Sequence, residues 1–332
     1  MGAQKLSNLS LNDEARAQLA KMQSEKAEVM KFAKLKKPLT IVIMVVGIVL
    51  AFFTKGITLI LAIVGAIALN VVFGKKIKDG LTDAAEAQEK MIEAALSEVI
   101  DKPSFNEEVS FSEAEELIGS SIKLSGKYKV AKNCLTGTYQ DVPFTTMDIH
   151  CFDVKKDRKA TKKTEIDCVK KGRVYAEGLF TKTKFNKTID GAVIILPKYV
   201  DSYSFSLSDF SRIKMDNPAF ESEYTVYATS QIAAFTVLDA VLMENMLSIG
   251  AGEHPGIIII EDDQILLKMS FPYSEKEVVP AGNEFELENN SFISELYEPY
   301  ISEADVLAAL EAELSTLKVL YDNLDIGNRI YV

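Results

Sequence analysis

The chain has 332 residues, of which 37 are Lys or Arg and 48 are Asp or Glu, and its formal net charge is −11. An acidic chain is a poor candidate for binding nucleic acid, because the phosphate backbone attracts basic surfaces. Cys134, Cys151 and Cys168 are odd in number and form no C-x-x-C pair, which favours reduced thiols over a disulfide framework.

Leu39–Phe73 is almost entirely apolar and carries one charged residue, Lys55, beside a break at Thr54-Lys55-Gly56. A membrane crossing needs roughly 20 apolar residues. The two halves, Leu39–Phe53 and Ile57–Phe73, are slightly shorter, and flanking lysine stems can extend them. The pattern therefore predicts a two-helix transmembrane hairpin. A buried hairpin in a soluble protein is the alternative.

Lysines flank this stretch on both sides. Positive residues close to a membrane mark its cytoplasmic face, so both termini are expected to be cytoplasmic in a multi-pass hairpin. The flanking lysines are Lys31, Lys34, Lys36 and Lys37 before the stretch, and Lys75, Lys76 and Lys78 after it.

A heptad-like stripe precedes the apolar stretch and another follows it, each broken once by a polar residue. The pattern predicts an antiparallel cytosolic coiled-coil stalk, and two helices lying separately on the membrane or on the globular domain are the alternative. The stripes are Ala15, Leu19, Met22, Lys26, Val29 and Ala33, then Ile77, Leu81, Ala84, Gln88, Met91, Ala95 and Val99.

The rest of the chain predicts an α+β domain. A capping box at Ser112–Glu115 opens a short helix, and Asp101-Lys102-Pro103 ends the helix before it. From Ile122 onward, β-branched and aromatic residues stand at alternate positions, which indicates strands. The segment Pro197–Pro218 is loop-like. Further expected elements are a helix from Ser230 to Ser248, a hairpin turning at Asp262-Asp263, a strand near Glu284–Glu288, and a helix from Glu303 to Leu324.

This order predicts a mainly antiparallel sheet with helices packed mainly on one face. The expected domains are an N-terminal cytosolic helix (1–37), a transmembrane helical hairpin (38–74), a stalk helix (75–101) and the α+β cytosolic domain (105–332).

The sequence assigns no catalytic residue, no metal site and no cofactor. His150 and His254 are the two histidines, and neither has a second histidine at metal-ligand spacing. A zinc site from the three cysteines and one histidine matches no common pattern. Acidic pairs such as Glu107-Glu108 and Glu115-Glu116 indicate a solvated face.

Lys155–Lys171 is a basic, turn-rich excursion between two strands. Such a loop could rest on anionic lipid, at roughly 1 kcal/mol per basic residue; a mobile hairpin loop kept soluble by charge is the alternative. The candidate lipid-contact residues are Lys155, Lys156, Arg158, Lys159, Lys162 and Lys163.

The stretch GLFTKTKFNKTIDGAVIILP resembles the bacterial family of the domain of unknown function 3137 (DUF3137), through a G-x-F, F-N-K, Gly and Pro signature. The segment around Pro218 to Tyr227 and the terminus with Asn328 and Arg329 agree with it, so the resemblance covers roughly Phe105 to Val332 together with the preceding expected membrane hairpin. It implies a membrane-associated protein of the bacterial inner membrane, and no activity. The matching residues, which fit structural roles, are Gly178, Phe180, Phe185, Asn186, Lys187, Gly191, Pro197, Asn328 and Arg329.

We therefore expect a membrane-anchored cytosolic binding or scaffold domain. Its expected partners are the lipid bilayer together with a protein, a lipid headgroup or a second copy of the chain. The alternative is a membrane-proximal, hydrolase-like enzyme that uses carboxylates and His254. A deep pocket with His150 or His254 on its wall would favour the enzyme.

Overall fold

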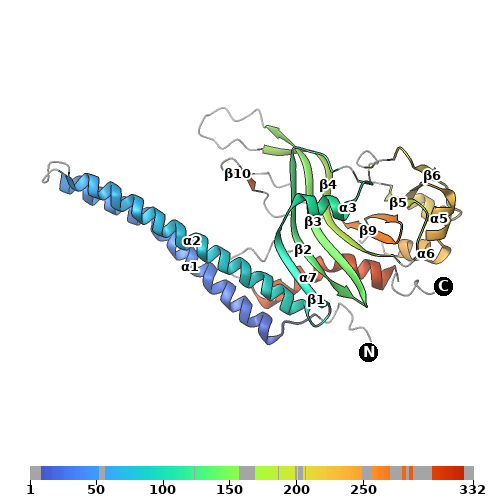
Figure 1. The fold of residues 1–332 in the computed structure, drawn as a ribbon, viewed down its shortest axis with the longest axis horizontal. Coiled ribbons are helices and arrows are strands. Elements are labelled where there is room, and N and C mark those ends of the chain that lie inside the picture. The colour runs from blue at the N-terminus through green and yellow to red at the C-terminus, as the bar shows by residue number, and fades with distance from the viewer. Residues whose placement is uncertain are drawn as a thin grey trace. The chain divides into compact units, whose positions relative to one another are not determined.

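The computed structural model describes residues 9–51, 57–122, 124–156, 169–185, 187–198, 200, 205, 207–248, 256–269, 279–281, 284–286 and 301–324 (Figure 1). The chain divides into a helical unit (Ser10–Ala95 with Leu296–Val306) and a sheet unit (Met1–Leu9, Leu96–Glu295 and Leu307–Val332).

Two long helices, α1 (Asp13–Ala51) and α2 (Ile57–Leu96), lie side by side and antiparallel in the helical unit (Figure 1). Contacts at three levels show this pairing. Asn12 Nδ2 donates to the carbonyl of Ala94 at 2.8 Å, and a Cβ at Gly80 would lie 2.7 Å from a Val29 methyl. Further along, the rings of Phe32 and Phe73 meet edge to face with centroids 5.5 Å apart.

Between Asp13 and Val29 the helix pair has a buried seam. Leu19 and Met22 of α1 and Ala87 and Met91 of α2 are buried in it. The start of helix α7 (Glu303–Glu313) and the residues before it belong to the same unit: Gln23 Nε2 donates to the carbonyl of Ile301 at 2.6 Å.

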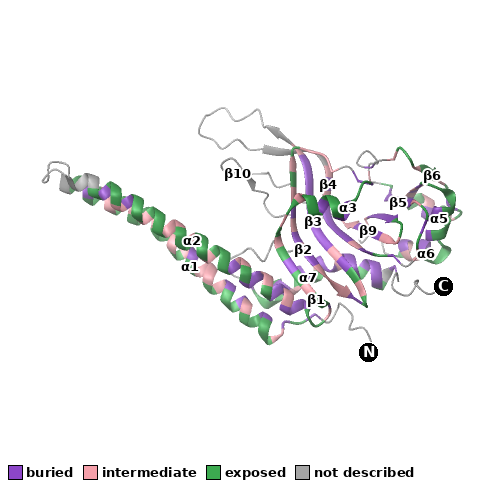
Figure 2. Ribbon diagram, in the orientation of Figure 1, coloured by how far each residue is buried: buried purple, intermediate pink, exposed green. Residues whose placement is uncertain are grey.

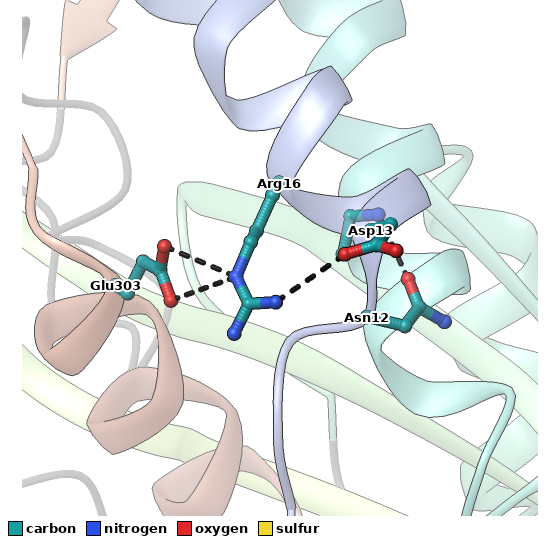
Figure 3. Close-up of polar contacts among 5 residues, drawn as sticks. Asn12, Asp13, Arg16 and Glu303 are labelled. Carbon is teal, nitrogen blue, oxygen red and sulfur yellow. Dashed lines mark hydrogen bonds and ion pairs between the residues drawn. The ribbon is translucent and has the colours of Figure 1, made fainter.

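Figure 3 shows Arg16 of α1 directed at Glu303 of α7, with Nε 3.2 Å from both carboxylate oxygens. Its Nη1 also lies 3.5 Å from Asp13 Oδ1. Both carboxylates are exposed, so solvent screening leaves each pair little effect on stability.

Within the described residues, no helix is both long and apolar enough to cross a membrane. The predicted transmembrane hairpin (Leu39–Phe53 and Ile57–Phe73) is therefore wrong, and the multi-pass inner-membrane topology with two cytoplasmic termini that rested on it is not supported. The physical reason is length: a crossing needs roughly 20 apolar residues. The apolar part of α1 starts after Lys37 and the helix ends at Ala51, while that of α2 reaches Lys75.

Helices α1 and α2 are each one continuous helix, so the elements do not test the predicted bounds between hairpin and stalk. Pro38 lies inside α1 without ending it.

The sheet unit contains a nine-stranded sheet in which all strand pairs are antiparallel, in the order β1-β2-β3-β4-β9-β8-β5-β7-β6. A separate pair consists of β10 (Val279–Ala281) and β11 (Glu284–Glu286). The nine strands are β1 (Asp101–Val109), β2 (Tyr128–Tyr139), β3 (Val142–Lys156), β4 (Val169–Lys184), β5 (Ala192–Pro197), β6 (Ser211–Ile213), β7 (Tyr224–Ala228), β8 (Ile257–Glu261) and β9 (Gln264–Met269).

Helices cover both faces of this sheet, whereas the sequence predicted mainly one. Helix α3 (Phe111–Ile118) packs in one core with Phe180 of β4. The next residue, Thr181, points to the opposite face because side chains alternate along a strand. There it bonds Thr316 of helix α8 (Ser315–Lys318), which leads into a π-helical turn, Val319–Asn323.

Three local predictions need correction. The capping box of α3 uses Ser110 and Glu113, two residues earlier than expected. The expected helix Ser230–Ser248 is two helices, α5 (Gln231–Val237) and α6 (Ala240–Ser248), because Asp239 Oδ1 accepts from the Leu242 amide at 2.8 Å and starts a new helix. Within the expected loop Pro197–Pro218 lies the short strand β6, followed by helix α4 (Pro218–Glu223).

Candidate functional site

The end of the helix pair beyond Phe32 and Phe73 carries exposed apolar side chains, and Figure 2 shows exposed residues along both helices there. Ile41 is 62% exposed, Leu61 64% and Val71 66%. We call this set the apolar helix surface. It consists of Leu39, Ile41, Val42, Val45, Val46, Ile48 and Val49 of α1, and Leu61, Ile63, Val64, Ile67, Val71 and Val72 of α2.

Small residues bring the two helices together beneath this surface. Gly47 is buried, and so are Ala62 and Ala66. Gly65 faces α1, because a Cβ there would lie 3.8 Å from an Ile43 methyl. With the small residues between the helices, the larger side chains point away from the partner helix.

The polar side chains in this region bond their own helix. Thr40 Oγ1 donates to the carbonyl of Lys36 at 2.8 Å, and Asn70 Nδ2 donates to the carbonyl of Ala66 at 2.9 Å. Such back-bonding occupies the polar groups locally. The described surface between the lysine clusters therefore presents almost only hydrocarbon, on a helix pair that is apolar all round.

Lysines border the apolar helix surface on both helices. Lys36 and Lys37 precede it on α1, and Lys75 and Lys76 follow it on α2. Lys76 Nζ lies 4.7 Å from the ring centroid of Phe32 on the other helix, so the two clusters meet at one level. The apolar helix surface therefore ends at a border of lysines.

A second cluster of polar groups lies inside the sheet unit. Asp148 of β3 is fully buried and accepts a 2.7 Å hydrogen bond from Asn133 Nδ2 of β2. Glu313, the last residue of α7, is 1% exposed. Burial, and then the charge of Asp148, raise the pKa of the Glu313 carboxyl well above its usual value.

Hydroxyl groups continue this cluster along the same helix–sheet boundary. Thr181 Oγ1 bonds the hydroxyls of Thr146 at 3.0 Å and Thr316 at 2.6 Å. Thr183 Oγ1 and Tyr321 Oη are 2.7 Å apart. The C-terminal helices thus contact the sheet through buried polar groups as well as through their leucines.

The histidine and cysteine candidates do not form an open reactive site. His150 is 3% exposed, with Nδ1 3.1 Å from Glu177 Oε1. Burial raises the pKa of Cys134 to about 11 and that of Cys151 to about 12, so both remain protonated thiols at neutral pH. Cys168 and His254 lie outside the described residues.

Burial lowers the pKa of Lys268 on β9 to about 8, and the charge of Glu177 opposes that shift. No group of three metal-ligating side chains able to hold an ion occurs among the described residues.

Two hollows of the described region lie in the sheet unit. One is a narrow apolar gap beside Phe185, Ile258 and Leu324. The other is an open depression beside Lys214, Asp216 and Glu221. Neither hollow has a histidine on its wall.

The family-signature residues that the structure describes occupy positions that fit structural roles. Phe180 and Phe185 are buried, as is Pro197. Gly178 and Gly191 have φ angles of 147° and 108°, which disfavour any residue with a Cβ. Asn186, Asn328 and Arg329 lie outside the described residues.

The candidate lipid loop falls largely outside the described residues as well. This applies to Arg158, Lys159, Lys162 and Lys163. Lys155 and Lys156 lie in β3, and the structure describes their backbone alone.

Residues 176–317 match the model of the family described as a protein of unknown function (DUF3137). This match supports the family resemblance for that part of the chain, and it includes the signature from Gly178 to Pro197 but not Asn328 and Arg329. No curated protein matches the chain. Among solved structures, the mycobacterial trehalose monomycolate transport factor A, TtfA, is similar at 14% identity and a TM-score of 0.32, over 52% of this chain and 76% of that chain.

Proposed function

We propose that this protein is a non-enzymatic binding or scaffold protein that attaches to an anionic phospholipid bilayer through the apolar helix surface. The observation that supports the proposal most directly is the apolar helix surface itself, because large contiguous apolar patches on proteins mark interaction sites. The proposal is one of lipid binding, and it includes no membrane crossing.

The distribution of the exposed side chains supports a lipid partner over a protein partner. A docked protein covers one stripe of a helix, whereas here the outward-facing half of each helix is apolar. Val45 of α1 and Ile67 of α2, on different helices, are both more than half exposed. Acyl chains can cover such a surface from every side.

The lysine border supports an anionic lipid in particular. Lys36, Lys37, Lys75 and Lys76 lie where the hydrocarbon surface ends, which is where headgroups would be. Lysines near an anionic membrane surface contribute about 1 kcal/mol each. Lysine stems also lie along apolar surface while the ammonium groups reach water.

The enzyme alternative has less support. Among the described residues, His150 and the Asp148–Glu313 carboxyl pair are closed off from solvent, and the hollows contain no histidine. A catalytic acid or base must reach its substrate, so these groups cannot serve as they stand.

Flotation of the full-length protein with vesicles tests the proposal. The variant Val45→Asp/Ile67→Asp places a carboxylate on each helix of the apolar helix surface, and Asp in lipid costs about 2.5–3.5 kcal/mol per residue when fully inserted. We expect at least a tenfold loss of the floated fraction. The control Ile232→Asp changes a residue 80% exposed in the sheet unit and should float like the parent protein.

Equal flotation of the parent and the double variant would contradict the proposal. So would a lipid-free sedimentation experiment in which the parent protein is a dimer and the double variant a monomer, because a second copy would then cover the surface.

A further inference from the structure

Glu313 lies where the C-terminal helices pack on the sheet, and both it and Asp148 of β3, whose charge acts on it, are buried. In the described part of the chain, neither carboxyl oxygen of Glu313 has a hydrogen-bond partner. Asp148 accepts its hydrogen bond from Asn133, which is itself 1% exposed. A buried polar group without a partner is costly, so its protonation state matters.

The charged groups around the pair favour a proton on Glu313. The charge of Asp148 acts on the Glu313 carboxyl, and like charges in a buried site disfavour double ionisation. On the same face of β3, His150 is engaged with Glu177. On the helical segment Leu310–Leu324, Glu311, Lys318 and Asp322 are exposed, and the buried phenol of Tyr321 meets the ring of Tyr139 edge to face.

Other contacts, made by groups that do not titrate near neutral pH, also hold the segment Leu310–Leu324 on the sheet. Thr316 and Tyr321 bond Thr181 and Thr183 of β4. Leu310, Leu314, Leu317 and Leu320 are buried at the same boundary. The segment Leu310–Leu324 is therefore bound by apolar and hydroxyl contacts plus one carboxyl pair that can change its charge.

We propose that Asp148 and Glu313 form a proton-dependent latch, in which the neutral Glu313 carboxyl keeps Leu310–Leu324 docked on the sheet and its ionisation favours release. The sign follows from linkage. The docked state holds the proton more tightly than the released state, so docking is strongest below the ordinary pKa of a glutamate and weakens as pH rises toward the raised pKa. One proton changes the docking equilibrium by at most tenfold per pH unit in that range.

Hydrogen exchange of the full-length protein over a pH series tests the latch. After correction for the intrinsic exchange rate, the opening constant of amides in 310–324 should rise with pH, by up to tenfold per unit. Glu313→Gln cannot ionise and should remove this dependence. The control Glu311→Gln, an exposed glutamate on the same helix, should keep it. Equal pH dependence in the parent and Glu313→Gln, or none in the parent, would overturn the proposal.

A second measurement keeps the proposal testable if Glu313→Gln does not fold. The parent protein should show the infrared carbonyl band of a buried protonated carboxylic acid at neutral pH, and the band should disappear over the range in which protection is lost. Asp148→Asn removes the neighbouring charge, so the band should disappear at lower pH. Absence of the band at neutral pH, or no shift in Asp148→Asn, would overturn the latch.

Discussion

The rings of Phe32 and Phe73 meet edge to face with centroids 5.5 Å apart, and Lys76 lies over the Phe32 ring. This contact marks a boundary along the helix pair. On one side the seam is buried, as at Met22 and Met91, and on the other the large side chains face outward, as at Ile41. One pair of helices thus combines a buried seam with a surface of exposed apolar side chains.

Neutralising the lysine border should weaken binding to anionic vesicles. Lys36→Gln/Lys37→Gln removes two cations next to the apolar helix surface, and at about 1 kcal/mol each the dissociation constant should rise roughly thirtyfold. Vesicle titration at fixed low salt measures this. Binding to zwitterionic vesicles should not change.

The matched control is Lys198→Gln/Lys214→Gln, which removes two exposed cations from the sheet unit. An equal loss in this control would show that net charge, and not the border, governs binding.

Two helical glycines of α2 should respond oppositely to alanine. At Gly74 a Cβ meets nothing within 4 Å, so Gly74→Ala should stabilise the helix pair by about 0.5–1 kcal/mol. At Gly80 a Cβ would lie 2.7 Å from a Val29 methyl, and the stiff valine cannot yield easily. Gly80→Ala should therefore be destabilising, as measured by thermal unfolding followed by circular dichroism.

A double-mutant cycle isolates the cause. Val29→Ala/Gly80→Ala removes the clashing methyl, so it should be more stable than the sum of the single changes indicates. Additive effects would mean that α1 and α2 do not approach at this level.

Gly178 should tolerate no side chain. Its φ of 147° lies where residues with a Cβ are strained, and an added Cβ would collide with the carbonyl oxygen of Met269 on β9. Gly178→Ala should lower the free energy of unfolding of the sheet unit by about 2 kcal/mol or more. Denaturant titration checks this value, and a change within 0.5 kcal/mol would contradict the assigned strand pairing.

Local patterns predicted some elements well. The turn at Asp262-Asp263 joins β8 and β9, and Ile257–Ile260 is buried throughout, as a continuous apolar run indicates. The sequence does not predict strand β1, because Lys102-Pro103 also has the pattern of a helix stop. Proline is compatible with an edge strand, and β1 is at the edge of the sheet.

Strand β7 was missed although its sequence contains a signal. Tyr224, Val226 and Ala228 are buried alternately, a period-two pattern within a polar surrounding. The transmembrane prediction is wrong because it needs lysine stems to extend two short apolar segments, whereas no described helix is both long and apolar enough for a crossing.

The carboxyl pair could not be found from sequence spacing, because Asp148 and Glu313 come from distant parts of the chain. A weaker signal exists on the helix: Glu313 continues the apolar series of Val306 and Leu310 at helical spacing, and all three are buried. A glutamate at such a position indicates a buried carboxyl, but only the fold identifies its neighbour.

The most direct test of lipid binding uses the absence of tryptophan from the chain. Val46→Trp introduces a single fluorophore on the apolar helix surface, and Ile232→Trp places one on an exposed position of the sheet unit. With anionic vesicles, we predict that emission from Val46→Trp shifts to shorter wavelength and is quenched by brominated acyl chains, while Ile232→Trp does neither. Unchanged emission and no quenching in Val46→Trp would contradict the account.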